Sequence, residues 1–385
     1  MGVKGSRMQI LTIDVGTGTQ DIYLYRSGLS IENGYKMVMP SPTMRIREQI
    51  QAATQRQQGI LLTGVTMGGG PCHWAAEAHL RAGLPLFATL EAAQTFNDDL
   101  SWVENEMGIT IVSEDEAKRL DDFQHIELFD FKYPPIAEAF ENLGVSLNPQ
   151  AIGVAVFDHG AAPPGESDRR FRFEYLRRRI AAENSLSAFA FLAEDIPASM
   201  TRMQAVVKSA GPLDCPLVVM DTAPAAVLGA TLDENVAAHS RLMVVNIGNF
   251  HTLAFRLGPT GIEGVFEHHT GEIDLPRLET MLRAFARGDL QNEDVYDDHG
   301  HGALIINDQP LPLSAGDNPI VVSGPRRSFM RKSKLRMYFA APFGDMMISG
   351  CFGLLSAMAD RVPDIASVIE NALSADTSDT TPWDV

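Results

Sequence analysis

MQILTIDVGTGTQDIYLY, residues 8–25, consists of two apolar runs joined by a turn of glycine and threonine. The first run ends at Asp14 and the second begins directly after the turn, so the stretch predicts a β-hairpin. The glycines let backbone N–H groups approach a phosphate, the threonines add hydroxyl donors, and Asp14 lies where a Mg²⁺ ion or its waters could be held. This candidate phosphate turn consists of Gly16, Thr17, Gly18 and Thr19. An ordinary hairpin turn has the same pattern, so both interpretations are open at this point.

A second hairpin of the same plan begins near residue 240. In RLMVVNIGNFHTLAFR, residues 241–256, an apolar strand reaches a polar residue, a turn with glycine follows, and another strand leads away. Two phosphate-type hairpins in one chain are far less expected by chance than one. The repetition therefore favours phosphate-type turns over two ordinary hairpin turns.

Composition places the chain among acidic globular proteins. The 385 residues suffice for about two domains with ample core. A formal net charge of −18 argues against a general nucleic-acid binder, and no uninterrupted apolar run is long enough to cross a bilayer. Met1–Arg7 leads into the first strand without the pattern of a signal peptide. We therefore expect a cytoplasmic protein that binds neither nucleic acid nor membrane.

Strand-like and helix-like segments alternate through the first part of the chain, which is typical of an α/β sheet. The expected strands are 8–13, 21–26, 59–63, 85–89, 108–112, 126–131, 151–157 and 216–220. The expected helices are 44–56, 71–82, 114–121, 134–142, 172–195 and 198–209. The polar segment 374–385 predicts a disordered tail.

Five segments in this order resemble the nucleotide motifs of the actin-like ATPase superfamily, which includes sugar kinases, Hsp70 chaperones and actin. They look like the first phosphate motif, the first connecting helix, the second phosphate motif, the adenosine loop and the second connecting helix. The segments are residues 8–25, Asp221–Gly229, Asn246–Thr252, Val321–Arg327 and Gly344–Leu355. The resemblance implies an α/β, two-lobed fold of the duplicated ribonuclease H-like type, with an interlobe cleft that binds ATP and Mg²⁺.

The same resemblance implies the domain boundaries and the roles of individual residues. Residues 1–239 would form the N-terminal lobe with inserted segments, and residues 240–373 the C-terminal lobe, whose last helix packs back toward the first lobe. Asp14 would position Mg²⁺, and Asp221 would act as general base. The nucleotide would contact Gly16, Thr17, Gly18, Thr19, Asn246, Gly248, Asn249, Thr252, Gly324, Arg326 and Asp345.

Two positions depart from the superfamily pattern. The second phosphate motif usually begins with Asp, whereas this chain has Asn246, whose amide can orient water or phosphate but adds no charge toward Mg²⁺. The adenosine loop is usually richer in glycine, whereas Arg326 and Arg327 stand here after Pro325. These arginines could stack on a base or pair with phosphate, or they could be part of a solvated basic stretch.

A narrower resemblance is to a prokaryotic family of unknown function whose members carry the label pyruvate formate-lyase activating enzyme. The matching segments are Thr63–Pro71, Phe157–Gly160, Glu267–Gly271, Asp298–Gly302 and Ala341–Asp345. A glycyl-radical activase needs a three-cysteine iron–sulfur motif, and Cys72, Cys215 and Cys351 are too far apart in the sequence to form one. ATP-driven activators share the actin-like fold, so a protein partner to be activated is one implication.

Histidines gather in short segments with glycine and aspartate. Asp158–His159 and Asp298–His301 combine carboxylate with imidazole, which suits a transition metal or a general base. We take His159, His299 and His301 as candidate metal ligands; scattered structural histidines are the alternative. Gly68–Pro71 follows a strand and precedes a helix, so it is either an anion site at a helix N-terminus or a tight turn.

The sequence thus predicts an ATPase or phosphotransferase, acting as an activator or a small-molecule kinase. An alternative from another class is a non-hydrolysing binding protein, or a metal-dependent enzyme, that uses the histidine loops in the same cleft. A filament-forming structural protein is the third possibility, because the fold alone does not determine function.

Overall fold

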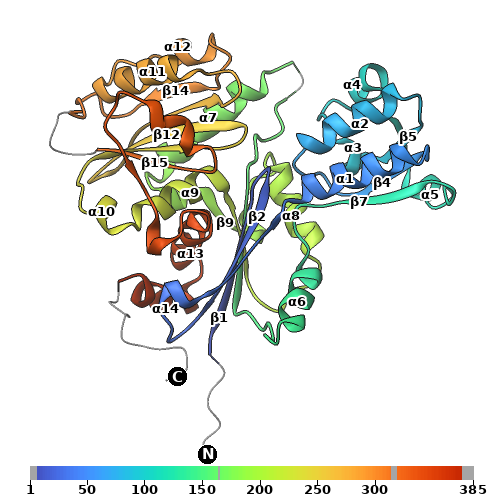
Figure 1. The fold of residues 1–385 in the computed structure, drawn as a ribbon, viewed down its shortest axis with the longest axis horizontal. Coiled ribbons are helices and arrows are strands. Elements are labelled where there is room, and N and C mark those ends of the chain that lie inside the picture. The colour runs from blue at the N-terminus through green and yellow to red at the C-terminus, as the bar shows by residue number, and fades with distance from the viewer. Residues whose placement is uncertain (1–6, 164, 314–318, 375–385) are drawn as a thin grey trace, which may run out of the picture.

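The computed structural model describes residues 7–163, 165–313 and 319–374. These residues form two six-stranded sheets and one four-stranded sheet, each with helices packed beside it (Figure 1). No helix in this part of the chain combines the length and the apolar character needed to span a membrane. The predicted tail, 374–385, lies outside the described residues except for Ser374.

The first sheet has the strand order β3-β2-β1-β8-β10-β9. β1, β2 and β3 form an antiparallel meander, and β1, β8 and β10 run parallel. The strands are β1 (Gln9–Val15), β2 (Thr19–Arg26), β3 (Tyr35–Pro40), β8 (Ala151–Val156), β9 (Ala190–Leu192) and β10 (Leu217–Asp221). Parallel neighbours need crossover connections, which here contain α6 (Tyr133–Asn142), α7 (Asp168–Ala182) and α8 (Thr201–Ala210).

The second sheet repeats this plan with the order β14-β13-β12-β11-β15-β16. β11, β12 and β13 form the antiparallel meander, and β15 and then β16 lie parallel on the other side of β11. The strands are β11 (Leu242–Ile247), β12 (His251–Gly258), β13 (Gly261–His269), β14 (Gly302–Ile305), β15 (Ile320–Ser323) and β16 (Tyr338–Phe339). α11 (Leu275–Arg287) and α12 (Asn292–Tyr296) lie between β13 and β14 in the chain. The shared core order, with one extra edge strand in each sheet, is the duplicated ribonuclease H-like arrangement of the actin-like fold, as predicted.

An insertion between β3 and β8 forms the third sheet. Its four parallel strands have the order β6-β5-β4-β7 and have a hydrophobic core of their own. The strands are β4 (Ile60–Gly64), β5 (Leu86–Thr89), β6 (Thr110–Val112) and β7 (Gln124–Leu128). Its helices are α1 (Pro42–Gln55), α2 (Pro71–Arg81), α3 (Leu90–Ala93), α4 (Leu100–Trp102) and α5 (Glu114–Ala117). Figure 1 shows this insertion to the right of the first sheet, whereas the second lobe lies to the upper left of the first sheet.

Two helices cross with their backbones in contact. α9 (Thr222–Thr231) leads from the first sheet to the second, and α13 (Ser349–Arg361) returns and packs on the first sheet beside α14 (Pro363–Ser374). A Cβ atom on Gly353 would lie 1.9 Å from the carbonyl oxygen of Ala225, and one on Gly229 would lie 1.8 Å from that of Ser349. Only glycine at these two positions allows this crossing, which packs the end of the chain against the first lobe.

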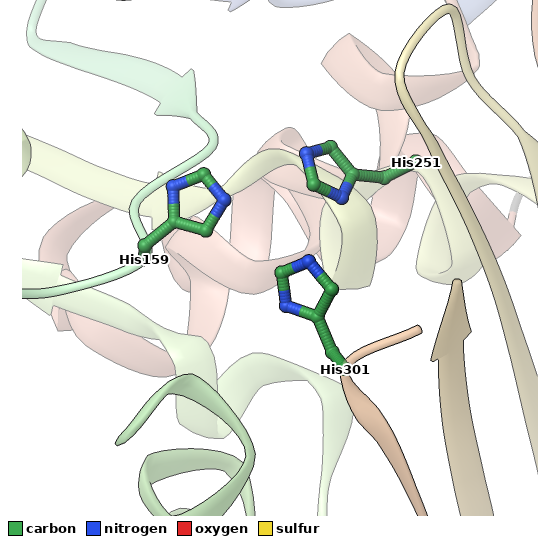
Figure 2. A group of neighbouring side chains, drawn as sticks. All are labelled: His159, His251 and His301. Atoms are coloured by element: carbon green, nitrogen blue, oxygen red, sulfur yellow. The ribbon is translucent and has the colours of Figure 1, made fainter. Parts of the chain in front are cut away.

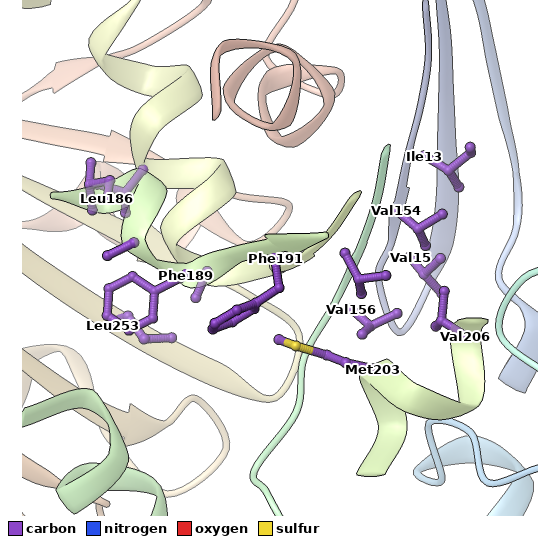
Figure 3. Packing of buried hydrophobic residues seen from close by; sticks show 14 of the residues in the cluster. Ile13, Val15, Val154, Val156, Leu186, Phe189, Phe191, Met203, Val206 and Leu253 are labelled. Atoms are coloured by element: carbon purple, nitrogen blue, oxygen red, sulfur yellow. The ribbon is translucent and has the colours of Figure 1, made fainter. Parts of the chain in front are cut away.

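The largest hydrophobic cluster runs through both lobes. Figure 3 shows side chains of β1, β8 and α8 packed with Phe189 and Phe191, and with Leu253 of the second lobe. All of these side chains are buried, and the cluster continues into β11, β13 and β15. Burial of apolar surface therefore stabilises the contact between the lobes. The short helix α10 (Glu234–Ala237) follows α9 in the chain beside this contact.

The helix predicted over 172–195 is wrong in its second half. α7 ends at Ala182 because Glu183 takes an extended conformation, with φ −148° and ψ 105°. The side chain of Asn184 then accepts a hydrogen bond from Ile262 N, which anchors the chain to the second lobe. Residues 190–192 form the edge strand β9 instead, a tertiary pairing that helical periodicity cannot reveal.

Candidate active site between the lobes

A cavity of about 450 Å³ lies where the two lobes and the insertion meet. The turns of both predicted hairpins line it, together with the loop after β15 and the start of α13. The insertion adds its glycine loop before α2. The cavity therefore brings together segments that lie far apart in the chain, from Asp14 to Gly350.

The first hairpin presents its turn and two carboxylates to the cavity. Gly16 N donates to Thr19 O at 2.9 Å, which closes the turn. Asp14 and Asp21 are directly opposed in the antiparallel register of β1 and β2, so their side chains lie on the same face of the hairpin. Both line the cavity, as do all four residues of the phosphate turn, Gly16, Thr17, Gly18 and Thr19.

The two carboxylates are poorly neutralised by protein groups. Thr222 Oγ1 donates to Asp14 Oδ1 at 2.5 Å, whereas no described residue hydrogen-bonds Asp21 Oδ1. Burial raises the pKa of Asp14 to about 6, and burial together with the neighbouring charge of Asp14 raises the pKa of Asp21 to about 8. A divalent cation would relieve both effects, because it supplies the missing positive charge.

The second hairpin faces the first across the cavity. Gly248 N donates to His251 O at 2.9 Å, which is the same turn closure as in the first hairpin. Asn246, Gly248 and Asn249 line the cavity, and a Cβ atom on Gly18 would lie 3.1 Å from Asn249 Nδ2, so the two turns nearly touch. The predicted ligand Thr252 is buried instead, and its hydroxyl hydrogen-bonds that of Thr270 at 2.9 Å.

The loop after β15 reaches the cavity through Gly324 and Pro325. Gly324 has φ +97°, and a Cβ atom there would lie 2.5 Å from Ile247 O, so the loop lies against the second hairpin. Arg326 is exposed and does not line the cavity. Asp345 also lies outside the lining and pairs with Lys36 at 3.6 Å, so the structure removes both Arg326 and Asp345 from the predicted contact set.

Asp221 is fully buried at the N-terminus of α9 and does not line the cavity. Its Oδ1 accepts from Ala223 N at 3.1 Å, and its Oδ2 pairs with the guanidinium of Arg172. A general base must reach the proton that it removes, so this placement does not fit the predicted role. Thr222, the next residue, faces the cavity instead and hydrogen-bonds Asp14.

Arg172 of α7 joins the two lobes through buried charges. Besides Asp221 of the first lobe, it faces Glu267 of β13, with 3.4 Å between Arg172 Nε and Glu267 Oε2. The guanidinium also donates to Asp158 O at 3.0 Å and lies over the ring of Phe157. The neighbouring side chains of His301, Arg172 and His251 hold the pKa of the Glu267 carboxyl well below its usual range despite burial. This network determines which way Glu267 points.

Three histidines converge beside Glu267. One ring nitrogen from each of His159, His251 and His301 lies within 4.8 Å of the others, and Figure 2 shows these nitrogens directed into the space between the rings. His159 follows β8, His251 begins β12, and His301 precedes β14. The Nδ1 atoms of His251 and His301 lie 3.2 and 3.4 Å from Glu267 Oε1.

Burial favours the neutral form of two imidazoles here, those of His301 and His269. Burial lowers the pKa of His301 to about 3 and that of the neighbouring His269 to about 4, so both rings have a free lone pair at neutral pH. His159 and His269 line the main cavity, and both also line a second cavity of about 320 Å³ together with His301. His299, a predicted metal ligand, is exposed with φ 67° and is not in the cluster, where His251 stands instead.

The glycine loop before α2 is already occupied by a protein carboxylate. Gly68 N lies 3.2 Å from Asp130 Oδ2, and Arg202 Nε donates to the same oxygen at 2.7 Å. Asp130 therefore takes the place of the anion that this loop could otherwise bind. Gly68, Gly69 and Gly70 still line the cavity, which makes the loop part of its wall.

Sequence comparison identifies the family. Residues 67–329 match the profile of a family described as "Putative pyruvate format-lyase activating enzyme (DUF1786)", and this match covers more than half of the chain. The chain belongs to this family. The matched DUF1786 region contains the histidine cluster, Glu267 and Arg172, whereas the first hairpin precedes it. A comparison with curated proteins gave no match.

Three solved structures that are similar to this DUF1786 protein are distant in sequence. A ROK family transcriptional regulator, a homolog of E. coli MLC protein, is 9% identical over 66% of this chain and 38% of its own, with a TM-score of 0.22. The ROK hexokinase of Thermus thermophilus is 12% identical over 66% of this chain and 48% of its own, with a TM-score of 0.21. MreB5 of Spiroplasma citri bound to ADP is 13% identical over 94% and 99%, with a TM-score of 0.32. The aligned part spans less than half of the first two proteins, and the fold assignment rests on the strand order of the two sheets.

Sequence reasoning missed three members of this DUF1786 site. Asp21 could have been found, because a two-stranded hairpin with this turn places it opposite Asp14. His251 lay within the predicted second phosphate motif but was not expected as a cluster member. Glu267 gave no signal of its own, because its role depends on tertiary contacts with Arg172 and two histidines.

Proposed function

We propose that the cleft binds ATP together with Mg²⁺ and that the protein is an ATPase or a phosphotransferase. One observation carries this proposal. The turns of two corresponding hairpins, one from each half of a duplicated fold, face a single cavity that also holds two carboxylates, the half-buried Asp14 and the buried Asp21. Backbone N–H groups in such turns suit phosphate oxygens, and carboxylates suit the accompanying cation.

Within this proposal each lobe has a separate part. Asp14 and Asp21 hold the cation or its waters, and residues 16–19 and 248–249 contact the phosphates from opposite sides. Gly324 and Pro325 lie near the base. The group that accepts the phosphoryl is water or a small-molecule hydroxyl, and lobe closure would couple the nucleotide state to a partner protein in the activator variant of this function.

The cysteines support ATP chemistry over the radical chemistry that the family description suggests. Cys72 is buried in the core of the insertion, and Cys351 is buried in the first lobe against Thr12 and Asp21. Cys215 is half-buried on the first lobe. Thiolates so separated do not supply the three ligands that an iron–sulfur cluster of a radical activase needs.

The test is a thermal shift with ATP and Mg²⁺. Ligand at about 100 times its Kd contributes about 2.7 kcal/mol to the free energy of unfolding, so the wild type should show a clear rise in Tm. Asp14→Asn should lose that rise, because the amide cannot neutralise the cation. Asp364→Asn is the matched control, since this carboxylate is exposed on α14 and lies outside the cavity lining, and it should keep the rise. Absence of a shift with every nucleoside triphosphate would refute the proposal.

A further inference from the structure

We infer that His159, His251 and His301 bind one divalent transition-metal ion, with Zn²⁺ as the best fit, and that its fourth coordination position opens toward the cleft. The ion would lie between the two lobes, beside but separate from the cation proposed at Asp14 and Asp21. The inference does not depend on nucleotide binding, because none of the three imidazole rings is among the groups proposed to contact the phosphates or the cation. His251 closes the second phosphate turn only through its backbone carbonyl.

The geometry of the three rings fits a metal better than it fits packing alone. Zn–N bonds of about 2.0–2.1 Å place the ligand nitrogens of a tetrahedral site about 3.4 Å apart. The three nitrogens already lie within 4.8 Å of one another and are directed into a common space, so small side-chain rotations close the site (Figure 2). Neutral imidazole is also the ligand form that zinc requires.

An independent observation concerns atoms without partners. His301 is 1% exposed, yet no described residue hydrogen-bonds its Nε2 atom. A buried ring nitrogen without a partner costs free energy unless something outside the protein satisfies it. A metal ion in the space between the rings would do so.

Glu267 supplies the second shell that histidine metal sites commonly have. Its Oε1 faces the Nδ1 atoms of both His251 and His301, and no described residue hydrogen-bonds this oxygen either. A carboxylate that accepts from one nitrogen of a ligand ring fixes its orientation and increases the basicity of the other nitrogen. Glu267 is itself held by Arg172, so the second shell is fixed before metal enters.

The buried charges near the site leave room for a cation. Asp221 and Glu267 are two carboxylates that share one guanidinium, that of Arg172. The excess negative charge has no water to solvate it, because all three side chains are 0% exposed. A divalent ion in the space between the three rings would offset this excess negative charge.

The ligands come from both lobes, which gives the ion a structural consequence. His159 follows a strand of the first sheet, whereas His251 and His301 belong to the second sheet and its connecting loop. An ion bound by all three holds the lobes together at the inner end of the cleft. Its open position faces the cavities that His159 and His269 line, where a substrate oxygen or a water could bind.

The experiment is calorimetric titration of the chelator-stripped, full-length protein with Zn²⁺ alone, in the absence of nucleotide. The wild type should bind one equivalent and gain thermal stability, and Co²⁺ in place of zinc should give the visible absorption of a tetrahedral site. His159→Gln and His251→Gln should each lower the affinity at least about 100-fold. Glu267→Gln should lower it about 10- to 100-fold, as is typical of second-shell changes.

His299→Gln is the matched control, because it removes an exposed histidine two residues from His301 and outside the cluster. It should bind zinc like the wild type. The inference is overturned if the wild type binds no zinc, or if His299→Gln loses binding as far as His251→Gln does. Circular dichroism and the Tm of each metal-free variant separate a lost ligand from a lost fold. A negative result here combined with an ATP-dependent shift would leave the nucleotide proposal intact, and the reverse combination would leave the metal site intact.

Discussion

The two hairpins that face each other across the cleft share one backbone plan and differ in their side chains. In both, a glycine N–H closes the turn on the carbonyl three residues later, Gly16 on Thr19 and Gly248 on His251, at 2.9 Å in each case. The register places Asp14 opposite Asp21 in the first hairpin and Asn246 opposite Leu253 in the second. The backbone therefore performs the same task twice.

The side chains at matched positions divide the chemistry between the halves. Asp14 and Asp21 of the first hairpin correspond to Asn246 and Leu253, so both carboxylates are absent from the second hairpin. At the position of Thr19 the second hairpin has His251, a member of the histidine cluster. The two hairpins thus share a backbone turn, but the first has carboxylates, which suit a hard cation, and the second has an imidazole, which suits a transition metal.

The most severe way to break the junction between these halves is Arg172→Met. The change removes the single guanidinium that both Asp221 and Glu267 face, and it leaves two carboxylates buried without their partner. We expect a loss of about 3–5 kcal/mol in the free energy of unfolding, measured by urea denaturation.

The matched control for this variant is Arg177→Met on the same helix. Arg177 is 55% exposed and pairs only with Glu174, at 3.6 Å, so its loss should cost less than about 1 kcal/mol. Equal effects of the two variants would show that the buried network does not stabilise the junction.

The hairpins could be predicted from sequence, whereas the network could not. Local sequence signals indicated both phosphate turns and the crossing of the connecting helices. These signals are the turn glycines, the alternating apolar residues and the carboxylate after a strand. Asp221 matched its motif in position, yet docking of α7 places Arg172 on it, and nothing in the local sequence indicates that contact. The histidine cluster joins loops distant in the chain, so spacing favoured His299 over His251.

A second prediction uses pH to separate the hairpins. Burial raises the pKa of Asp21 from 3.8 to about 8 and that of Asp14 to about 6, so the folded protein binds these protons more tightly than the unfolded chain does. Without divalent cations, the free energy of unfolding should therefore fall by several kcal/mol as the pH rises from about 4 to about 8, since each tenfold change in proton affinity corresponds to about 1.4 kcal/mol. Urea denaturation in chelator at several pH values measures this slope.

Asp21→Asn should flatten most of that decline, because it removes the carboxyl with the higher pKa. Saturating Mg²⁺ should flatten it in the wild type as well, since the cation favours the ionised pair. If the free energy of unfolding of Asp21→Asn still falls with pH as steeply as that of the wild type, groups outside the first hairpin cause the pH dependence.

A third prediction concerns the connecting helices, which are the other matched pair of the duplicated fold. Gly353→Ala puts a methyl group 1.9 Å from the carbonyl oxygen of Ala225, so α9 and α13 must move apart. We expect a loss of about 1–3 kcal/mol and a lower Tm. Gly271→Ala, where a Cβ atom meets nothing within 4 Å, should change the Tm little, and a comparable loss there would exclude the crossing as the cause.

The smallest change restores the symmetry of the two hairpins. Asn246→Asp gives the second hairpin a carboxylate at the position that matches Asp14, where the side chain already lines the cavity. With saturating Mg²⁺ the third carboxylate should strengthen ATP binding about tenfold, or about 1.4 kcal/mol, whereas in chelator it should weaken ATP binding by repulsion. Asn105→Asp adds the same charge on the exposed surface of the insertion and should do neither. Only a cation shared between the lobes produces opposite effects on ATP affinity in the two conditions. An equal change in ATP affinity with and without Mg²⁺ would therefore mean that Asn246 does not face the cation. The side-chain difference between the hairpins would then not be explained by cation binding.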